Sequence, residues 1–159
     1  MELEKYLSGD LFRLDIVSDK KEDVIQELVR SLCVAKCLQP VDVILDSVFV
    51  REEDRSTGIG NDVAIPHART DLVKTIFLAL GRSKTGVPWR STDAKPVHFI
   101  FLVVGPKKAS EDYLQVLADI SRLMSRASVR SALLEAPSAA EVLRIIGQTK
   151  PRKTVPGTK

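Results

Sequence analysis

The sequence predicts an α/β fold, namely a three-layer α/β/α sandwich with a mixed sheet of four to five strands. Segments with strand periodicity interleave with segments of helical periodicity. Val97–Val104 is nearly continuous in apolar residues, as expected for a strand that is buried on both faces. The 159 residues, 44% hydrophobic and 28% charged, suit one compact domain. We expect this domain over residues 1–148 and a flexible basic tail over 149–159.

The first strand and the first helix are predicted before Pro40. Phe12–Ile16 alternates apolar and polar residues, which is the period of a half-buried strand. Asp19, followed by Glu22, forms a capping-box pattern with Asp19 as the cap. The helix behind it is expected to end near Leu38, because proline disfavours helical geometry in the residue before it.

A second helix and two further strands follow. Apolar residues at helical spacing predict a helix over Val41–Glu53, with Arg51 near its end. Val63–Ile65 is expected to be a short strand that stops at Pro66, because proline cannot donate to a strand ladder. Thr75–Leu80 is predicted to be a stronger strand.

The remaining chain is predicted to be a connection followed by helices. Gly81–Lys95 is polar and is expected to form a loop or a hairpin before the apolar strand. Ser110 can cap a helix whose apolar stripe runs to Met124. A short helix is predicted around Val129–Leu134, and a capping box that starts at Ser138 opens the last helix.

The charge pattern argues against nucleic-acid and membrane partners. The net charge of +3 arises from four basic residues among the last ten, and the rest of the chain has 20 basic against 21 acidic residues. The longest wholly apolar run has six residues, whereas a membrane-spanning helix needs about 20. Met1–Lys5 carries acids before any apolar stretch, unlike a secretory signal. We therefore expect no nucleic-acid binding and no direct membrane insertion.

Two cysteines lie four residues apart in the first predicted helix. This spacing places Cys33 and Cys37 on one face, where we expect two small buried apolar side chains. A metal site would need more ligands nearby, and a disulfide at this spacing in a helix is geometrically awkward. The pattern favours a reducing, cytoplasmic compartment.

Two histidines could carry chemistry, and their settings differ. His98 lies inside the apolar strand and is expected to be a hydrogen-bonded core or edge residue. His67 directly follows Pro66, a few residues after Gly58 and Gly60. Neutral imidazole is a good nucleophile near pH 7, and glycines let backbone N–H groups approach an anion. His67 is therefore the candidate phosphate acceptor.

Two arginines could assist His67. Arg69 follows by two residues, so on an extended chain it could share the face of His67, while Arg51 must approach from the end of the preceding helix. The guanidinium fork matches phosphoryl oxygens at two points. A histidine in a glycine-containing loop is also common without a function, so spacing alone leaves a purely structural His67 open.

The segment at residues 56–69 reads Ser-Thr-Gly-Ile-Gly-Asn-Asp-Val-Ala-Ile-Pro-His-Ala-Arg. It resembles the active-site signature of enzyme IIA proteins of the fructose/mannitol type. These belong to the bacterial phosphoenolpyruvate-dependent sugar phosphotransferase system and include nitrogen-regulatory members. Pro96–Pro106 resembles the strand after the active-site hairpin of the family, and Leu114–Ala118 resembles its following helix. The resemblance extends from about Leu7 to Ile146.

The resemblance implies a phosphohistidine relay that needs no cofactor and no metal. His67 would be the phosphorylated histidine, with its Nδ1–H held by a backbone carbonyl and its Nε2 as the acceptor. Arg51, 16 residues earlier, would neutralise the oxygens of the migrating phosphoryl group. The other expected phosphate-binding residues are Arg69, Gly58, Gly60, Asn61 and Tyr113.

The resemblance also implies partners. The donor would be the histidine phosphocarrier protein, and the acceptor would be a IIB component or a regulatory target protein. We favour the nitrogen-regulatory branch, because sugar-specific IIA components are often fused to transport domains. The alternative is a regulatory binding module that does not transfer the group and whose contacts are switched by phosphorylation of His67.

Two positions depart from the family pattern. Tyr113 stands where many members carry a second histidine, and a phenol can donate a hydrogen bond but cannot be a cation. Packing of Tyr113 in the apolar stripe is an equally open interpretation. Asp62 replaces a glycine, and we expect an exposed loop acid without a role rather than a group that tunes the histidine. For Trp89 we expect core or hairpin packing rather than a partner surface.

Overall fold

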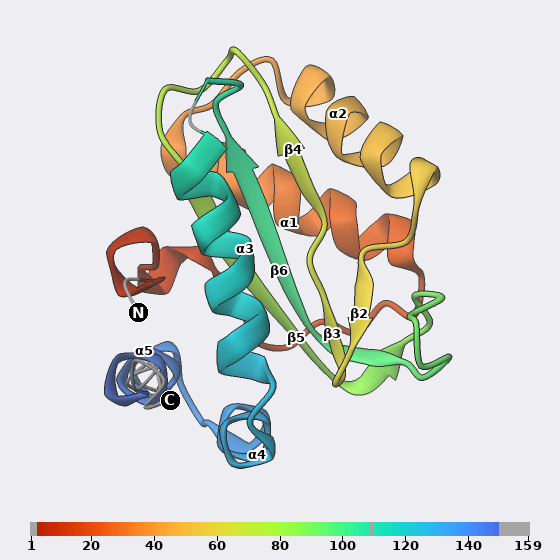
Figure 1. The fold of residues 1–159 in the computed structure, drawn as a ribbon, viewed down its shortest axis with the longest axis vertical. Helices are drawn as coiled ribbons and strands as arrows, with labels where there is room; N and C mark the ends of the chain where they lie inside the picture. The colour runs from red at the N-terminus through yellow and green to blue at the C-terminus, as the bar shows by residue number, and fades with distance from the viewer. Residues whose placement is uncertain (1–2, 109, 150–159) are drawn as a thin grey trace, which may run out of the picture.

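A mixed sheet lies between two layers of helices (Figure 1). The computed structural model describes residues 3–108 and 110–149. One face of the sheet is covered by α1 (Lys21–Lys36) and α2 (Val41–Asp54), and the other by α3 (Ser110–Met124) and α5 (Ala139–Gln148). The short α4 (Ala127–Glu135) connects α3 to α5. The predicted three-layer sandwich is therefore confirmed.

Outside these helices and the sheet, the structure describes two short helices near the N-terminus and one residue of the predicted tail. Two short 3₁₀ helices, η1 (Leu3–Tyr6) and η2 (Gly9–Leu11), precede the first strand and were not predicted. The predicted basic tail lies outside the described residues, apart from Thr149, which is the C-cap of α5. Among residues 3–108 and 110–149, no helix combines the length and the apolar character that a bilayer crossing requires.

The sheet has six strands, in the order β1-β5-β6-β3-β2, and β4 also pairs with β6. The pairs β5–β6 and β2–β3 are antiparallel, and the pairs β1–β5, β3–β6 and β4–β6 are parallel. The strands are β1 (Phe12–Arg13), β2 (Gly58–Gly60), β3 (Val63–Ala64), β4 (His67–Arg69), β5 (Phe77–Val87) and β6 (Val97–Gly105). The strands β2 and β4 were not predicted, because three-residue strands that contain glycine or follow proline show no alternating pattern.

Pro66 interrupts one edge of the sheet without ending it. The strand β3 ends at Ala64, one residue earlier than the predicted Val63–Ile65, and the chain resumes pairing with β6 at His67, opposite Val103. The carbonyl of Pro66 accepts a hydrogen bond from the backbone N–H of Val103 (3.0 Å). This interruption places His67 on a strand that is fixed to the centre of the sheet.

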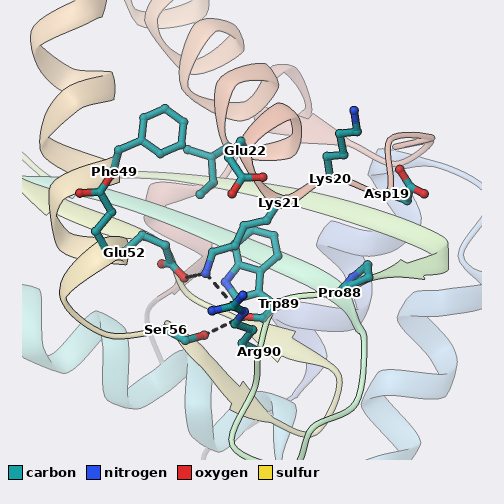
Figure 2. Close-up of a pocket in the computed structure, with 12 residues that line it drawn as sticks. Asp19, Lys20, Lys21, Glu22, Phe49, Glu52, Ser56, Pro88, Trp89 and Arg90 are labelled. Atoms are coloured by element: carbon teal, nitrogen blue, oxygen red, sulfur yellow. Dashed lines mark hydrogen bonds and ion pairs between the residues drawn. The ribbon is translucent and has the colours of Figure 1, made fainter.

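The strand β5 is longer than predicted. It continues through Gly81, where the sequence favoured a loop or a hairpin from Gly81 to Lys95, so only the stretch between Val87 and Val97 connects the two strands. A Cβ at Gly81 would lie 2.5 Å from Cδ1 of Ile16, so the absence of a side chain at Gly81 lets Ile16 pack directly against the strand. Trp89 in the connection, labelled in Figure 2, is buried. Its Nε1 donates to Oγ1 of Thr57 (3.2 Å), and the packing interpretation is confirmed.

The helix caps were predicted with mixed success. Ser138 caps α5 as predicted, and its Oγ accepts a hydrogen bond from the backbone N–H of Glu141 (3.2 Å). The predicted Asp19 cap is wrong, because α1 begins one residue later, with Lys20 as an N-cap that makes no side-chain capping bond. Ser18 contacts this turn instead, since its Oγ accepts from the backbone N–H of Lys20 (3.2 Å). The helix α3 begins at Ser110 itself.

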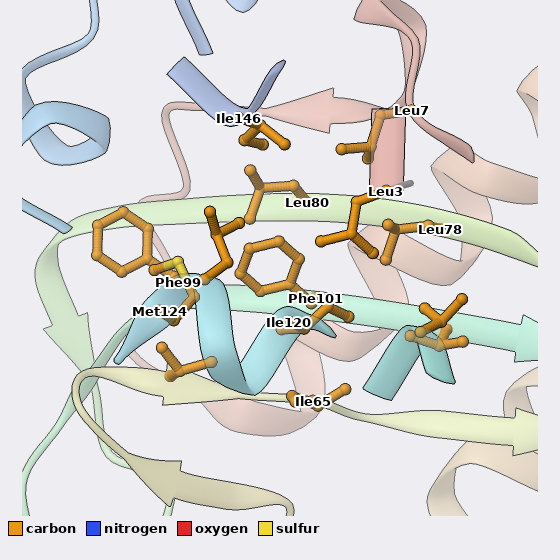
Figure 3. Packing of buried hydrophobic residues seen from close by; sticks show 14 of the residues in the cluster. Leu3, Leu7, Ile65, Leu78, Leu80, Phe99, Phe101, Ile120, Met124 and Ile146 are labelled. Atoms are coloured by element: carbon orange, nitrogen blue, oxygen red, sulfur yellow. The ribbon is translucent and has the colours of Figure 1, made fainter. Parts of the chain in front are cut away.

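The strand β6 is buried on both faces, as predicted. Phe99, Phe101 and Val103 belong to the cluster beneath α3 and α5, which Figure 3 shows from close by. The alternate residues belong to the cluster beneath α1 and α2; these are Ile100, Leu102 and Val104. Each large apolar side chain contributes roughly 1.5–3 kcal/mol to stability when it is fully buried. Because β6 supplies such side chains to both clusters, it is the centre of the core.

A buried arginine joins α4 to the sheet. Arg82 on β5 is 4% exposed. Its Nη1 donates to the carbonyls of Leu133 (2.9 Å) and Ala136 (2.6 Å), and its Nε donates to that of Leu14 (3.0 Å). The guanidinium thus satisfies carbonyls at the end of α4 that have no partner within the helix.

The two cysteines have different environments. Cys33 is buried, as predicted, but Cys37 is exposed, and both are unpaired thiols. The prediction is wrong for Cys37 because α1 ends at Lys36, and Cys37 is its C-cap with a φ of 55°. The helical spacing that would place both thiols on one face therefore does not extend to Cys37.

Candidate functional site

The strand β4, which begins at His67, runs between α2 and α3 (Figure 1). His67 lines two cavities. The first cavity, of about 600 Å³, is also lined by Arg51, Arg69 and Tyr113. The second, of about 430 Å³, is also lined by Arg51 and by residues 55–59. The structure therefore brings together the predicted nucleophile, both predicted arginines and Tyr113.

The ring of His67 has a defined tautomer. Its Nδ1 lies 2.7 Å from the carbonyl oxygen of Ile65. A carbonyl only accepts hydrogen bonds, so Nδ1 carries the proton and Nε2 of the neutral ring keeps its lone pair. This is the arrangement that the family resemblance implied.

The surroundings of His67 favour the neutral imidazole. Burial lowers the pKa of His67 below 6.5, and the charges of Arg51 and Arg69 lower it further, while the hydrogen bond to Ile65 and the charge of Glu52 oppose this shift. The ring is half-buried rather than sealed. Near pH 7 the side chain is therefore an uncharged imidazole that borders a cavity and keeps a lone pair on Nε2.

The two arginines differ in solvent exposure. Arg51, in the last turn of α2, is half-buried, and its Nη1 donates to the carbonyl of Arg55 (2.8 Å). Arg69 is exposed and follows His67 by two residues on β4, and both line the first cavity. The Cζ of Arg69 lies 4.7 Å from the ring centroid of Tyr113, a cation–π distance. Two positive charges thus flank the imidazole.

Tyr113 packs in the core, which is one of the two interpretations that the sequence left open. It is 3% exposed and belongs to the core cluster beneath α3. It also borders the first cavity, and its ring lies edge-on to that of His67, with 6.0 Å between the centroids. A Cβ at Gly105 would lie 2.6 Å from Cδ2 of Tyr113, so the absence of a side chain there makes room for the ring.

The hydroxyl group of Tyr113 is buried without a hydrogen-bond partner among the described residues. Burial raises the pKa of this phenol far above its usual value, although Arg69 and Arg51 oppose the shift. The phenol therefore keeps its proton at neutral pH. It is a hydrogen-bond donor beside His67 that has no acceptor among the described residues. Buried polar groups are usually hydrogen-bonded, so this unpaired donor requires an explanation.

Comparison with known proteins shows the family of the chain. The family model described as "Phosphoenolpyruvate-dependent sugar phosphotransferase system, EIIA 2" matches residues 5–149 of the chain. The chain belongs to this family. The resemblance that the sequence motif indicated is thereby confirmed.

Relatives of the chain include proteins named as fructose-specific components and as nitrogen regulatory proteins. The fructose-specific EIIABC component of Bacillus subtilis is 37% identical over 148 residues, which are 93% of this chain and 23% of that protein. The chain thus spans less than a quarter of that relative. The crystal structure of the nitrogen regulatory protein IIA-Ntr from Neisseria meningitidis has a TM-score of 0.84 at 30% identity, covering 91% of this chain and 98% of that chain.

A more distant structure shares the fold alone. The complex of enzyme IIA for mannitol with phosphorylated enzyme IIB, from Escherichia coli, has a TM-score of 0.78 at 18% identity. The match covers 90% of this chain and 98% of that chain.

The predicted phosphate-binding glycines have other roles in this IIA protein. Gly58 borders the second cavity, but its N–H donates to Ser56 Oγ (3.2 Å), and a Cβ there would lie 2.2 Å from Ser91 Oγ. Gly60 ends β2 with a φ of 86°, and Asn61 and Asp62 form the turn to β3 with φ values of 55° and 65°. Neither Gly60 nor Asn61 lines a cavity that contains His67. The structure therefore does not bring Gly60 and Asn61 together with the nucleophile.

Asp62 lies in the β2–β3 turn, as the predicted loop acid, with a side chain that is 42% exposed, while its backbone joins the turn to the sheet. It is half-buried, and its backbone carbonyl accepts hydrogen bonds from the N–H groups of His98 (2.8 Å) and Phe99 (3.0 Å). Its carboxylate lies 3.6 Å from Nδ1 of His98. The backbone of Asp62 thus fixes the β2–β3 turn to β6, and His98 lies half-buried on this central strand, with the Asp62 carboxylate as a polar neighbour rather than the predicted hydrogen-bond partner.

The sequence interpretation missed Glu52. This carboxylate is 7% exposed and accepts hydrogen bonds from the backbone and side chain of Thr57, which follows α2. It occupies the next helical position of the buried stripe formed by Ile44, Leu45 and Val48. An acid at an apolar position of an amphipathic helix was the signal that could have revealed it.

No metal centre is evident in the described part of the chain. Across residues 3–108 and 110–149, the His, Cys, Asp and Glu side chains form no group of three that could hold a metal ion. The charges that face His67 come instead from the side chains of the protein.

Proposed function

We propose that this IIA protein accepts a phosphoryl group on Nε2 of His67 from the histidine phosphocarrier protein and passes it to a IIB component. The hydrogen bond from Nδ1 to Ile65 (2.7 Å) is the observation that carries the proposal. It leaves Nε2 as the nucleophilic nitrogen in a ring whose burial and flanking arginines disfavour protonation.

The transfer is an in-line displacement at phosphorus. The lone pair on Nε2 of His67 forms a bond to phosphorus while the bond between phosphorus and the histidine nitrogen of the donor breaks. The pair of electrons from the broken bond returns to the donor imidazole. The proton on Nδ1 stays in the hydrogen bond to Ile65 and stabilises the phosphorylated ring. The second transfer reverses these steps toward a nucleophile of the acceptor.

Charge on the phosphoryl oxygens is balanced by the arginines at the site. Arg51, anchored on the carbonyl of Arg55, would neutralise the equatorial oxygens in the transition state. Arg69 on the same cavity supplies a second guanidinium. The hydroxyl of Tyr113 would donate a hydrogen bond to a phosphoryl oxygen and thereby gain the partner that it lacks.

The partners follow from the family. A complex of a IIA protein with phosphorylated IIB supports a IIB component as the acceptor.

We favour a nitrogen-regulatory role, which the likeness to IIA-Ntr supports. We also propose that the protein acts in the cytoplasm, where its two free thiols stay reduced.

A second candidate function is a regulatory module that is phosphorylated on His67 but does not pass the group on. The observation that favours it is Tyr113, which borders the site in place of the second histidine of the family and cannot become a cation. A dianion between Arg51 and Arg69 would change the contacts of this surface.

Phosphorylation in a reconstituted relay tests the proposal. The protein is incubated with phosphoenolpyruvate, enzyme I and the phosphocarrier protein, and we expect an acid-labile, base-stable phosphate. His67→Ala should abolish the label, while His98→Ala, the matched control at the other histidine, should keep it. Equal labelling of wild type and His67→Ala would refute the assignment. Labelling of His67 without transfer to any IIB component would favour the regulatory module.

A further inference from the structure

A buried ion pair connects the first turn of α1 with the last turn of α2. The Nζ of Lys21 pairs with Oε1 of Glu52, and both side chains are largely buried, at 18% and 5% exposed (Figure 2). The same ammonium donates to the carbonyl of Trp89 (3.4 Å) and lies 5.3 Å from the centroid of its ring. Glu52 is thus a charged carboxylate that is held in a fixed position.

Glu52 in turn fixes the loop that follows α2. Its Oε1 accepts a hydrogen bond from the backbone N–H of Thr57 (3.0 Å), and its Oε2 accepts one from Oγ1 of Thr57 (2.5 Å). The same Oγ1 accepts a hydrogen bond from Nε1 of Trp89 (3.2 Å). Thr57 is therefore held on three sides by polar contacts, although it lies in a connecting loop.

A short chain of hydrogen bonds continues from this loop to the nucleophile. The carbonyl of Thr57 accepts from the backbone N–H of Ile65 (3.0 Å), and the carbonyl of Ile65 accepts from Nδ1 of His67 (2.7 Å). Thr57 also lines the second cavity beside His67. A shift of Thr57 would therefore move the group that orients the imidazole.

The charge of Glu52 also acts on His67. Glu52 raises the pKa of His67 and so opposes burial, Arg51 and Arg69. The remaining titratable or charged groups that line the two cavities with His67 are Asp54, Arg55 and Tyr113. Glu52 lines neither cavity, but it is a buried carboxylate joined to His67 through the hydrogen bonds of Thr57 and Ile65.

We propose that Glu52 is a positioning residue for the phosphoryl acceptor, which orients His67 through Thr57 and Ile65 and whose charge, moderated by Lys21, acts on the imidazole. This role deepens the proposed function and rests on it. Lys21 moderates the effect of Glu52 on His67, because its ammonium compensates part of the negative charge of Glu52.

Two substitutions that change the charge near His67 in opposite directions test the electrostatic part of the proposal. Glu52→Gln keeps the size and an acceptor oxygen but removes the negative charge, so the pKa of His67 should fall. Lys21→Met removes the compensating charge, so the pKa of His67 should rise, and Lys21→Arg should restore the wild-type value. Glu53→Gln is the matched control, because Glu53 is exposed and adjacent on α2. Ring-proton NMR titration of the uniformly labelled protein measures each value directly, without phosphorylation.

The positioning part is tested by the rate of labelling. The acid limb of the rate–pH profile should move to lower pH in Glu52→Gln and to higher pH in Lys21→Met. Thr57→Val removes the hydroxyl that bonds Glu52 and Trp89 and should lower the plateau rate about tenfold, because small displacements of a reacting group are costly. The acid limb of Thr57→Val should move less than that of Glu52→Gln. Circular dichroism identifies any variant that fails to fold.

The outcomes separate this proposal from the function on which it rests. If the wild-type protein takes no phosphate from the phosphocarrier, the proposed function is wrong, while the NMR titrations still decide whether Glu52 acts on His67. If Glu52→Gln and Glu53→Gln give the same pKa for His67 and the same rates, Glu52 has no positioning role even when His67 is phosphorylated. Shifts of the same sign in Glu52→Gln and Lys21→Met would also contradict the proposal.

Discussion

The Tyr113 hydroxyl is buried beside His67 without a hydrogen-bond partner among the described residues, so its removal should have opposite effects on stability and on transfer. Burial of an unpaired donor costs about 1–3 kcal/mol. Tyr113→Phe keeps the ring against Gly105 and removes only this cost, so the free energy of unfolding should rise by about 1 kcal/mol.

The transfer reaction should respond in the other direction. A hydrogen bond to a charged group is worth about 1.5–3 kcal/mol, so loss of a donor to the phosphoryl group should slow labelling of His67 by roughly 10- to 100-fold. A gain in stability at the expense of activity is typical of a site residue whose polar group serves the reaction.

Two assays on one preparation measure both effects. Urea unfolding of the unphosphorylated protein gives the change in stability, and rapid-quench labelling by the phosphorylated carrier gives the rate. Tyr6→Phe at the other tyrosine, in η1, is the matched control and should leave the labelling rate unchanged. A Tyr113→Phe variant that is labelled as fast as wild type would refute the role of the hydroxyl, and a less stable variant would show that it has a partner in the resting protein.

Three further predictions concern other groups. Arg51→Lys replaces the planar fork by a single ammonium and should slow labelling at least tenfold, with an unchanged circular dichroism spectrum; equal rates would exclude Arg51 from the site. Because the pKa of His67 lies below 6.5 in the folded protein, its neutral ring contributes stability above that pH. Wild type should therefore lose stability relative to His67→Gln as the pH falls from about 7 through the folded pKa, and a difference that is constant with pH in urea unfolding would contradict the shift. Arg82→Met removes a donor from the carbonyls of Leu14, Leu133 and Ala136, of which that of Leu133 keeps the backbone N–H of Ala136 as a donor, and should cost about 1–3 kcal/mol, measured by the same unfolding method, whereas no change would show that the other two carbonyls find new partners.

The parts of the fold that depend on local pattern were predictable from the sequence. The apolar run of β6 predicted a strand that is buried on both faces, and the Ser138 capping box predicted the start of α5. The Asp19 cap failed because several polar residues near a helix start compete, and tertiary contacts select among them. The strand β5 continues through Gly81 because pairing with β6 and close packing outweigh the low strand propensity of glycine.

The site was predictable where a motif fixes chemistry and less so where packing decides. His67, Arg51, Arg69 and Tyr113 converge as the resemblance implied. Gly60 and Asn61 belong to the same contiguous motif, but their left-handed φ values serve a turn away from the nucleophile. Glu52 was missed because its role depends on Lys21 and Thr57, which lie on other segments of the chain and meet it only in the folded protein.

Nuclear magnetic resonance of the phosphorylated, ¹⁵N-labelled protein tests the central claim most directly. Coupling between phosphorus and a ring nitrogen identifies both the residue and the nitrogen that carries the group. The account predicts phosphorus on Nε2 of His67, with Nδ1 still protonated against the carbonyl of Ile65. Phosphorus on Nδ1, or on any other side chain, would contradict it.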